Sequence, residues 1–172
     1  RHAAMDAARV QCHTVVARHG QMDDHLSPLS GGFPCETLTV RRARDDGAGD
    51  ASGQSLQGNA GQDILRGGDG ADTLFGGSGI DLADYADANT GVRADLANSD
   101  VNTGFADGDI YSGIEGITGT KFNDILGGDD ASNIFFALDG EDVVRAQDGN
   151  DTSYGGNGGG WMGCACSSSL AM

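Results

Sequence analysis

Two consecutive nine-residue segments that share one pattern most constrain what this chain can fold into. Residues 67–75 and 76–84 read GGDGADTLF and GGSGIDLAD, and both follow Gly-Gly-x-Gly-x-Asp-x-apolar-x. Asp72 and Asp81 therefore occupy position six of their units, and an apolar residue belongs at position eight. A period this short indicates stacked repeats rather than a conventional globular core.

The residue types within one unit favour a tight, oxygen-lined loop. We expect Gly67, Gly68 and Gly70 to allow positive φ and so to turn backbone carbonyls toward a shared point, where Asp72 adds a carboxylate. Calcium accepts about six to eight oxygen ligands in flexible geometry, whereas magnesium requires a near-ideal octahedron. The loop therefore favours calcium.

A short strand is expected after each loop. Successive side chains of a strand point to opposite faces, so the position-eight side chain should point inward. The residues at this position include Leu65, Leu74, Leu126, Phe135, Val144, Ser153 and Met162.

A third unit precedes the first two in the same register. Residues 58–66, GNAGQDILR, place Asp63 nine residues before Asp72. Asp and Gly are also common in ordinary turns, because Asp caps its own backbone and Gly supplies positive φ. Turn chemistry alone predicts no fixed spacing between aspartates, so the constant spacing favours cation-binding loops.

These units resemble the nonapeptide repeats of the RTX (repeats-in-toxin) family, the hemolysin-type calcium-binding repeats of secreted bacterial proteins. The resemblance implies an all-β fold, a parallel β-roll in which each nonapeptide forms half a coil and loops 18 residues apart stack with calcium between them. Asp63 and Asp81 would then share an ion. Asp72 would form half a site, completed by Asp87, because the partner loop 85–90 lacks glycines.

A second, degenerate repeat block covers residues 119–163 in five unbroken units. Position six of these units reads Asp124, Asn133, Asp142, Asp151 and Gly160. The resemblance pairs Asp124 with Asp142, and Asn133 with Asp151. The second pair is the weaker one, because Asn offers a neutral oxygen.

These pairings imply two to three calcium ions. The expected ligands, through side-chain or backbone oxygens, are Gly58, Ala60, Asp63, Gly67, Gly68, Gly70, Asp72, Gly76, Gly77, Gly79, Asp81, Asp124, Asn133, Gly140, Asp142, Gly149 and Asp151.

Residues 85–118 interrupt the nine-residue period. Apolar and polar residues alternate over 92–96, and Ile110, Tyr111, Ile114 and Ile117 suggest two more short strands. The acids of this segment could include ligands, but nothing in their spacing singles one out, and we interpret them as solvated surface. They are Asp95, Asp100, Asp107 and Asp109.

Composition divides the chain into a head and an acidic body. Residues 45–172 hold 22 acidic against four basic residues, and 27 of the 30 glycines. We therefore expect a poorly ordered head over 1–48, a first repeat block over 49–84, a spacer over 85–118, the second block over 119–163 and a disordered tail over 164–172.

Charge and hydropathy exclude several classes of function. An acidic body argues against nucleic-acid binding, which depends on Lys and Arg. No apolar run approaches the length of a membrane span, and residues 1–30 do not follow the order of a secretory signal peptide. By resemblance, we expect a secreted, extracellular protein that leaves through a type I export machinery.

Two function classes remain. The first is a calcium-binding structural module without catalysis, in which calcium induces folding. The alternative is a non-catalytic C-terminal fragment of a secreted enzyme, such as a metalloprotease, lipase or epimerase, whose catalytic domain lies upstream. The chain itself has no His-Glu-x-x-His and no Gly-x-Ser-x-Gly motif, so we expect no enzyme activity from it.

Overall fold

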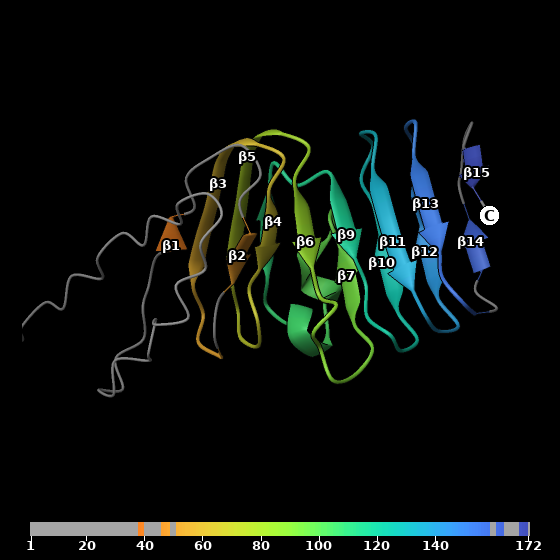
Figure 1. Cartoon of the computed structure of the whole chain (residues 1–172), viewed down its shortest axis with the longest axis horizontal. Coiled ribbons are helices and arrows are strands. Elements are labelled where there is room, and N and C mark those ends of the chain that lie inside the picture. The colour runs from red at the N-terminus through yellow and green to blue at the C-terminus, as the bar shows by residue number, and fades with distance from the viewer. Residues whose placement is uncertain (1–37, 40–45, 49–50, 159–160, 164–168, 172) are drawn as a thin grey trace, which may run out of the picture.

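The computed structural model describes residues 38–39, 46–48, 51–158, 161–163 and 169–171, and the side chains of 51–158. This part of the chain forms parallel strands stacked along one axis, with two short 3₁₀ helices, η1 (Ser99–Val101) and η2 (Gly104–Ala106) (Figure 1). The predicted all-β parallel β-roll is confirmed.

Three parallel sheets make up the two sides of the roll. One side is a seven-stranded sheet of β2 (Asp46–Ala48), β4 (Ile64–Arg66), β6 (Leu82–Asp84), β9 (Gly116–Thr118), β11 (Ile134–Leu138), β13 (Thr152–Gly155) and β15 (Ser169–Ala171). The other side consists of two four-stranded sheets. The first contains β1 (Leu38–Thr39), β3 (Ser55–Gly61), β5 (Thr73–Gly79) and β8 (Ile110–Ser112), and the second contains β7 (Arg93–Asp95), β10 (Ile125–Gly127), β12 (Val143–Arg145) and β14 (Trp161–Gly163).

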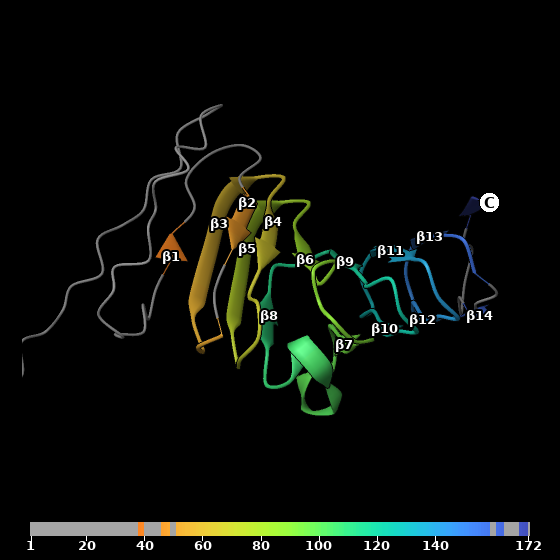
Figure 2. The same cartoon turned by 60° about the horizontal axis from the view of Figure 1, so that its bottom comes forward.

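Within each repeat block, paired residues lie 18 positions apart, as two units per coil require. Leu56 pairs with Leu74 in the first block, and Leu126 pairs with Val144 in the second. Figure 2 shows the two sides in the second block, with β9, β11 and β13 along one side and β10 and β12 along the other. Each nonapeptide therefore contributes half a coil.

The core is a narrow strip filled by position eight of each unit. These side chains are fully buried at Leu56, Leu65, Leu74, Ala83, Leu126, Phe135 and Val144. In most strands the neighbouring positions are partly or fully exposed, as in the intermediate–buried–exposed pattern of β12. The inward orientation predicted for position eight is confirmed for the described side chains, while the side chain of Met162 lies outside them.

The strands of the spacer are not stacked in the order in which they occur in the sequence. β7 pairs with β10 of the second block, whereas β8, which follows it in the chain, pairs with β5 of the first block. The chain therefore runs ahead from β6 to β7 and returns through η1 and η2 to β8 (Figure 2). On the opposite side, β6 pairs directly with β9, so the seven-stranded sheet passes the spacer without a break.

The strands β1, β2 and β15 lie within segments 1–48 and 164–172, which we expected to be without regular structure. Each of these strands pairs with a strand of the repeat body, and the poor order of the rest of both segments stays a prediction. Segments 1–37, 40–45, 164–168 and residue 172 lie outside the described residues.

The second block carries a polar group in the core strip. Ser153 occupies position eight and is 4% exposed, and its hydroxyl finds no hydrogen-bond partner among the described residues. A buried hydroxyl without a partner costs about 1–3 kcal/mol.

We expect Ser153→Ala to stabilise the folded chain by about 1 kcal/mol, because it removes this desolvated group. The measurement is the urea midpoint at saturating calcium. Ser112→Ala is the matched control, since Ser112 is an exposed strand residue of β8. Equal midpoints for the two variants would contradict the prediction.

Candidate metal sites

Position six of the repeat forms three columns of mostly acidic side chains. The first column contains Gln54, Asp72 and Asp109 before strands β3, β5 and β8. The second contains Asp63, Asp81, Glu115, Asn133 and Asp151 before β4, β6, β9, β11 and β13. The third contains Val92, Asp124 and Asp142 before β7, β10 and β12. All of these except Val92 and Glu115 are polar side chains no more than 6% exposed.

A ladder of hydrogen bonds runs along each column. The backbone N–H of one member donates to a side-chain oxygen of the next, at 2.7–2.9 Å. The donor and acceptor pairs are Gln54 to Asp72, Asp63 to Asp81, Asp72 to Asp109, Asp81 to Glu115, Val92 to Asp124, Asp124 to Asp142, and Asn133 to Asp151. One oxygen of each acceptor is thus fixed by the backbone of the neighbouring coil.

The second carboxylate oxygen is available for a cation in two of these residues. Oδ2 of Asp81 and Oδ2 of Asp151 are buried and accept no hydrogen bond from the described residues, although the two side chains are 0% and 2% exposed. A buried carboxylate oxygen needs a partner to offset its lost hydration. An oxygen-coordinated cation such as calcium fits this need.

The two loops expected to share an ion lie in direct contact. Residues 59–61 pair with residues 77–79 in parallel register, as a continuation of the β3–β5 ladder. A Cβ added to Gly58 would lie 2.6 Å from Asp63 Oδ2 and 2.6 Å from the carbonyl oxygen of Gly76. A carboxylate of one loop and a carbonyl of the next therefore converge on the same place.

The glycines at positions one, two and four have different physical roles. Gly68 and Gly70 adopt positive φ, at 94° and 123°, as predicted. Gly67 does not, so the predicted role of its conformational freedom is wrong. A Cβ on Gly67 would overlap Oδ2 of Asp72, so glycine at position one makes room for the carboxylate of its own loop.

The second block departs from this design. Gly140 and Gly149 keep the positive φ of position four, but position two is held by Leu138 and Gln147 at φ of 66° and 67°. A bulky residue at positive φ is strained. The loops of this block therefore form at a greater conformational cost than those of the first.

Asp124 and Asn133 already have protein partners for their side-chain oxygens. Asp124 accepts hydrogen bonds from the backbone of Val92 and from both the backbone and the hydroxyl of Thr120. Asn133 Oδ1 accepts from the backbone of Asp129. These contacts leave Asp124 and Asn133 with less unmet need for a cation than Asp81, whereas Oδ2 of Asp151 keeps that need.

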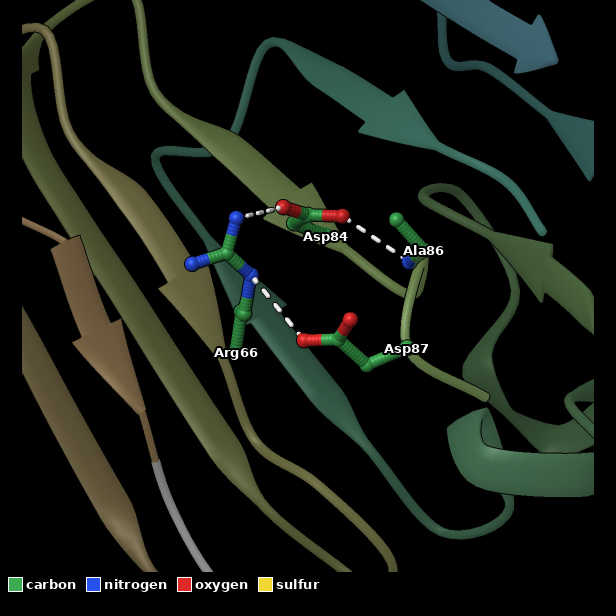
Figure 3. Close-up of polar contacts among 4 residues, drawn as sticks. All are labelled: Arg66, Asp84, Ala86 and Asp87. Carbon is green, nitrogen blue, oxygen red and sulfur yellow. Dashed lines mark hydrogen bonds and ion pairs between the residues drawn. The ribbon is translucent and has the colours of Figure 1, made fainter. Parts of the chain in front are cut away.

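Asp87 does not lie at the partner position expected for Asp72. Its side chain is 89% exposed, and one oxygen lies 3.9 Å from Nε of Arg66. Arg66 also pairs with Asp84 at 2.6 Å, on the outer face of the seven-stranded sheet (Figure 3). The residue that continues the column of Asp72 is instead Asp109, whose Oδ1 accepts from the backbone of Asp72 at 2.8 Å.

The position of Asp109 differs most from the prediction, because the sequence places this residue on a solvated surface. It is 0% exposed, and its Oδ2 accepts a hydrogen bond of 2.7 Å from the hydroxyl of Tyr85. A sequence signal was present. Asp109 precedes Tyr111 by two positions, and Glu115 precedes Ile117 by two, which is the spacing of positions six and eight.

Burial raises the pKa of several column carboxyls. Burial is the largest cause for Asp81, Asp124 and Asp142, and it raises the pKa of Asp109 from 3.8 to about 7. Because burial disfavours the charged form, these side chains favour either a proton or a nearby cation.

Acid should therefore stabilise the calcium-free fold. The folded pKa of Asp109 lies above its ordinary value, so the folded chain binds more protons than the unfolded chain between about pH 4 and pH 7. This contribution is lost as the pH rises through about 7. We expect β-type circular dichroism in chelator to be stronger at pH 5 than at pH 7.5, and Asp109→Asn to reduce the difference. A signal that falls on acidification would contradict this.

The packing around Gly76 predicts a large effect of one methyl group. A Cβ at this position would overlap the carbonyl oxygen of Gly113 and would lie 2.6 Å from Oδ2 of Asp81. We expect Gly76→Ala to destabilise the folded chain by about 3 kcal/mol, measured by urea unfolding at saturating calcium. Gly155→Ala is the control, because exposed Gly155 holds the same position of its unit. Similar midpoints would show that position one tolerates a side chain.

Within the described ranges, no group of three or more His, Cys, Asp or Glu side chains lies close enough to hold a metal ion. Side chains alone therefore do not complete a site, and backbone carbonyls would have to supply the remaining ligands. No helix in the described part of the chain is long and apolar enough to span a membrane.

Comparison with known proteins agrees with this geometry. No curated protein matches the chain. The RTX calcium-binding nonapeptide repeat matches residues 48–83 and 127–162, in four copies. These two ranges overlap most of both blocks of stacked loops, and such repeats bind calcium and are not catalytic by themselves. The two matched segments of the chain thus consist of RTX calcium-binding nonapeptide repeats.

Proposed function

We propose that this chain is a structural module of a secreted protein, and that it folds as calcium binds to its stacked loops. The observation that carries this proposal is Asp81, a fully buried carboxylate with one oxygen that has no hydrogen-bond partner among the described residues. Calcium is the cation that the repeat family binds.

The best-supported site lies between the loops 58–63 and 76–81. Asp63 and Asp81 would contribute carboxylate oxygens, and backbone carbonyls such as that of Gly76 would contribute the rest. The pairs Asp124 with Asp142 and Asn133 with Asp151 are weaker candidates, because Asp124 and Asn133 already accept hydrogen bonds from their own loops. We propose that the repeat loops bind two to three ions.

Charge makes folding depend on the cation. Residues 45–172 carry a net charge of −18, and the described part of the roll buries a narrow apolar core to offset the repulsion. Calcium supplies positive charge between carboxylates that burial would otherwise protonate. Because the unfolded chain has no preformed loops, the free energy of binding contributes to folding.

The free energy of calcium binding is large enough to switch the chain from unfolded to folded. One site at a thousandfold excess of calcium over its dissociation constant contributes about 4 kcal/mol, similar to the whole stability of a small domain. Low calcium inside the cell would keep the chain unfolded for a type I export machinery, and high calcium outside would fold it. Secretion and this route are supported by the family, whose members are typically secreted.

The test is far-ultraviolet circular dichroism of the chelator-treated chain during titration with calcium, with magnesium as the ion control. We expect a coil-like spectrum that becomes β-rich with calcium alone. Asp63→Asn or Asp81→Asn should raise the calcium midpoint at least about tenfold, equivalent to about 1.4 kcal/mol.

Asp69→Asn is the matched control for this titration. It makes the same change of charge in the neighbouring loop, but Asp69 is exposed and occupies position three. A spectrum that does not respond to calcium would overturn the proposal, and so would equal midpoints for all three variants.

A further inference from the structure

The second column continues into the spacer, and we propose that Glu115 and Asp81 form a further calcium site between the loops 76–81 and 113–115. The inference rests on the proposed function, since it extends the same chemistry to residues outside the repeat units. Residues 84–126, which include Glu115, lie between the two ranges that match the repeat family.

The carboxylate of Glu115 is linked to Asp81 through the backbone N–H of Asp81. Oδ1 of Asp81 accepts from the backbone of Asp63 at 2.8 Å, and the backbone N–H of Asp81 donates to Oε2 of Glu115 at 2.9 Å. Asp81 is 0% exposed, and its Oδ2 has no hydrogen-bond partner among the described residues. Oδ2 of Asp81 therefore lies on a column that Glu115 extends, and it would bridge the ion shared with Asp63 and the ion shared with Glu115.

The backbone around this oxygen repeats the arrangement of the best repeat site. A Cβ on Gly58 would meet Oδ2 of Asp63 and the carbonyl oxygen of Gly76, both at 2.6 Å. A Cβ on Gly76 would meet Oδ2 of Asp81 at 2.6 Å and would overlap the carbonyl oxygen of Gly113. The carbonyl of Gly113 thus takes, toward Asp81, the place that the carbonyl of Gly76 takes toward Asp63.

In the first column, by contrast, protein groups rather than a cation satisfy a buried carboxylate. Asp109 continues that column into the spacer, but both of its oxygens accept hydrogen bonds, from the backbone of Asp72 and from the hydroxyl of Tyr85. The Tyr85 hydroxyl lies 2.6 Å from the hydroxyl of Tyr111, so the polar cluster is closed by protein groups. A phenol satisfies Asp109, whereas no described group satisfies Oδ2 of Asp81.

The location of this site gives it a structural role. Asp81 precedes β6 and Glu115 precedes β9, and these two strands pair where the seven-stranded sheet passes the spacer. A cation held by both carboxylates would therefore link the first repeat block to the strand that leads into the second block.

The test compares the number of calcium ions bound by the full chain and by Glu115→Gln, measured by equilibrium dialysis at saturating calcium. Gln keeps an oxygen that can accept the hydrogen bond from Asp81 but removes the charge. We expect one ion fewer per chain. The matched control is Glu141→Gln, an exposed glutamate in the second block, which should bind as many ions as the unaltered chain.

The outcomes separate this inference from the proposed function. If the unaltered chain binds no calcium, both are wrong. If it binds calcium and Glu115→Gln binds the same number of ions, only the spacer site is wrong. A loss of one ion in Glu115→Gln but not in Glu141→Gln supports the site.

A second measurement covers the case in which Glu115→Gln does not regain the β-rich spectrum in calcium. The chain contains three glutamates, Glu36, Glu115 and Glu141, so ¹³C at the glutamate side-chain carboxyls gives three signals. Glu36→Gln and Glu141→Gln assign them. Exchange of calcium for lanthanum in the folded chain should shift the Glu115 signal and leave the others in place. A Glu115 signal that does not move would overturn the site.

Discussion

The stacking of buried carboxylates is the constraint on which the rest of this structure depends. A nine-residue half coil places every position-six side chain directly beside the one 18 residues away, so acids accumulate in columns. Among residues 51–158, the apolar compensation comes mainly from one inward residue per half coil. Each carboxylate must therefore be neutralised by a proton, a cation or a set of hydrogen bonds, and the choice differs along the chain.

The regular part of this design could be predicted from the sequence, because a constant period fixes both register and orientation. Once Asp63, Asp72 and Asp81 are nine residues apart, the pairing of coils and the inward position of Leu65 and Leu74 follow. The contact between loops 58–61 and 76–79 follows for the same reason. The role of Gly67 could not be predicted, because the clash between a side chain at this position and Asp72 appears only in the three-dimensional loop.

The strands of the spacer could be predicted from the sequence, but the strands with which they pair could not. Local alternation identifies segments such as 93–95 and 110–112, but it cannot show that the later strand returns to the first block while the earlier one joins the second. Hydrogen bonds between distant residues decide that path, above all those of Asp109 with the Tyr85 hydroxyl and the Asp72 backbone. These contacts also explain why Asp109, which the sequence predicts to be solvated, is buried.

The two sides of the roll consequently differ in how they connect the repeat blocks. On one side the sheet is split into two four-stranded parts, and the column of acids there ends at Asp109, which is satisfied by a phenol. On the other side the seven-stranded sheet is continuous from β6 to β9. In a stack where each coil contacts only its neighbours, cooperativity passes through such interfaces. Coupling between the blocks therefore depends chiefly on the continuous side, where Asp81 and Glu115 meet at the crossing.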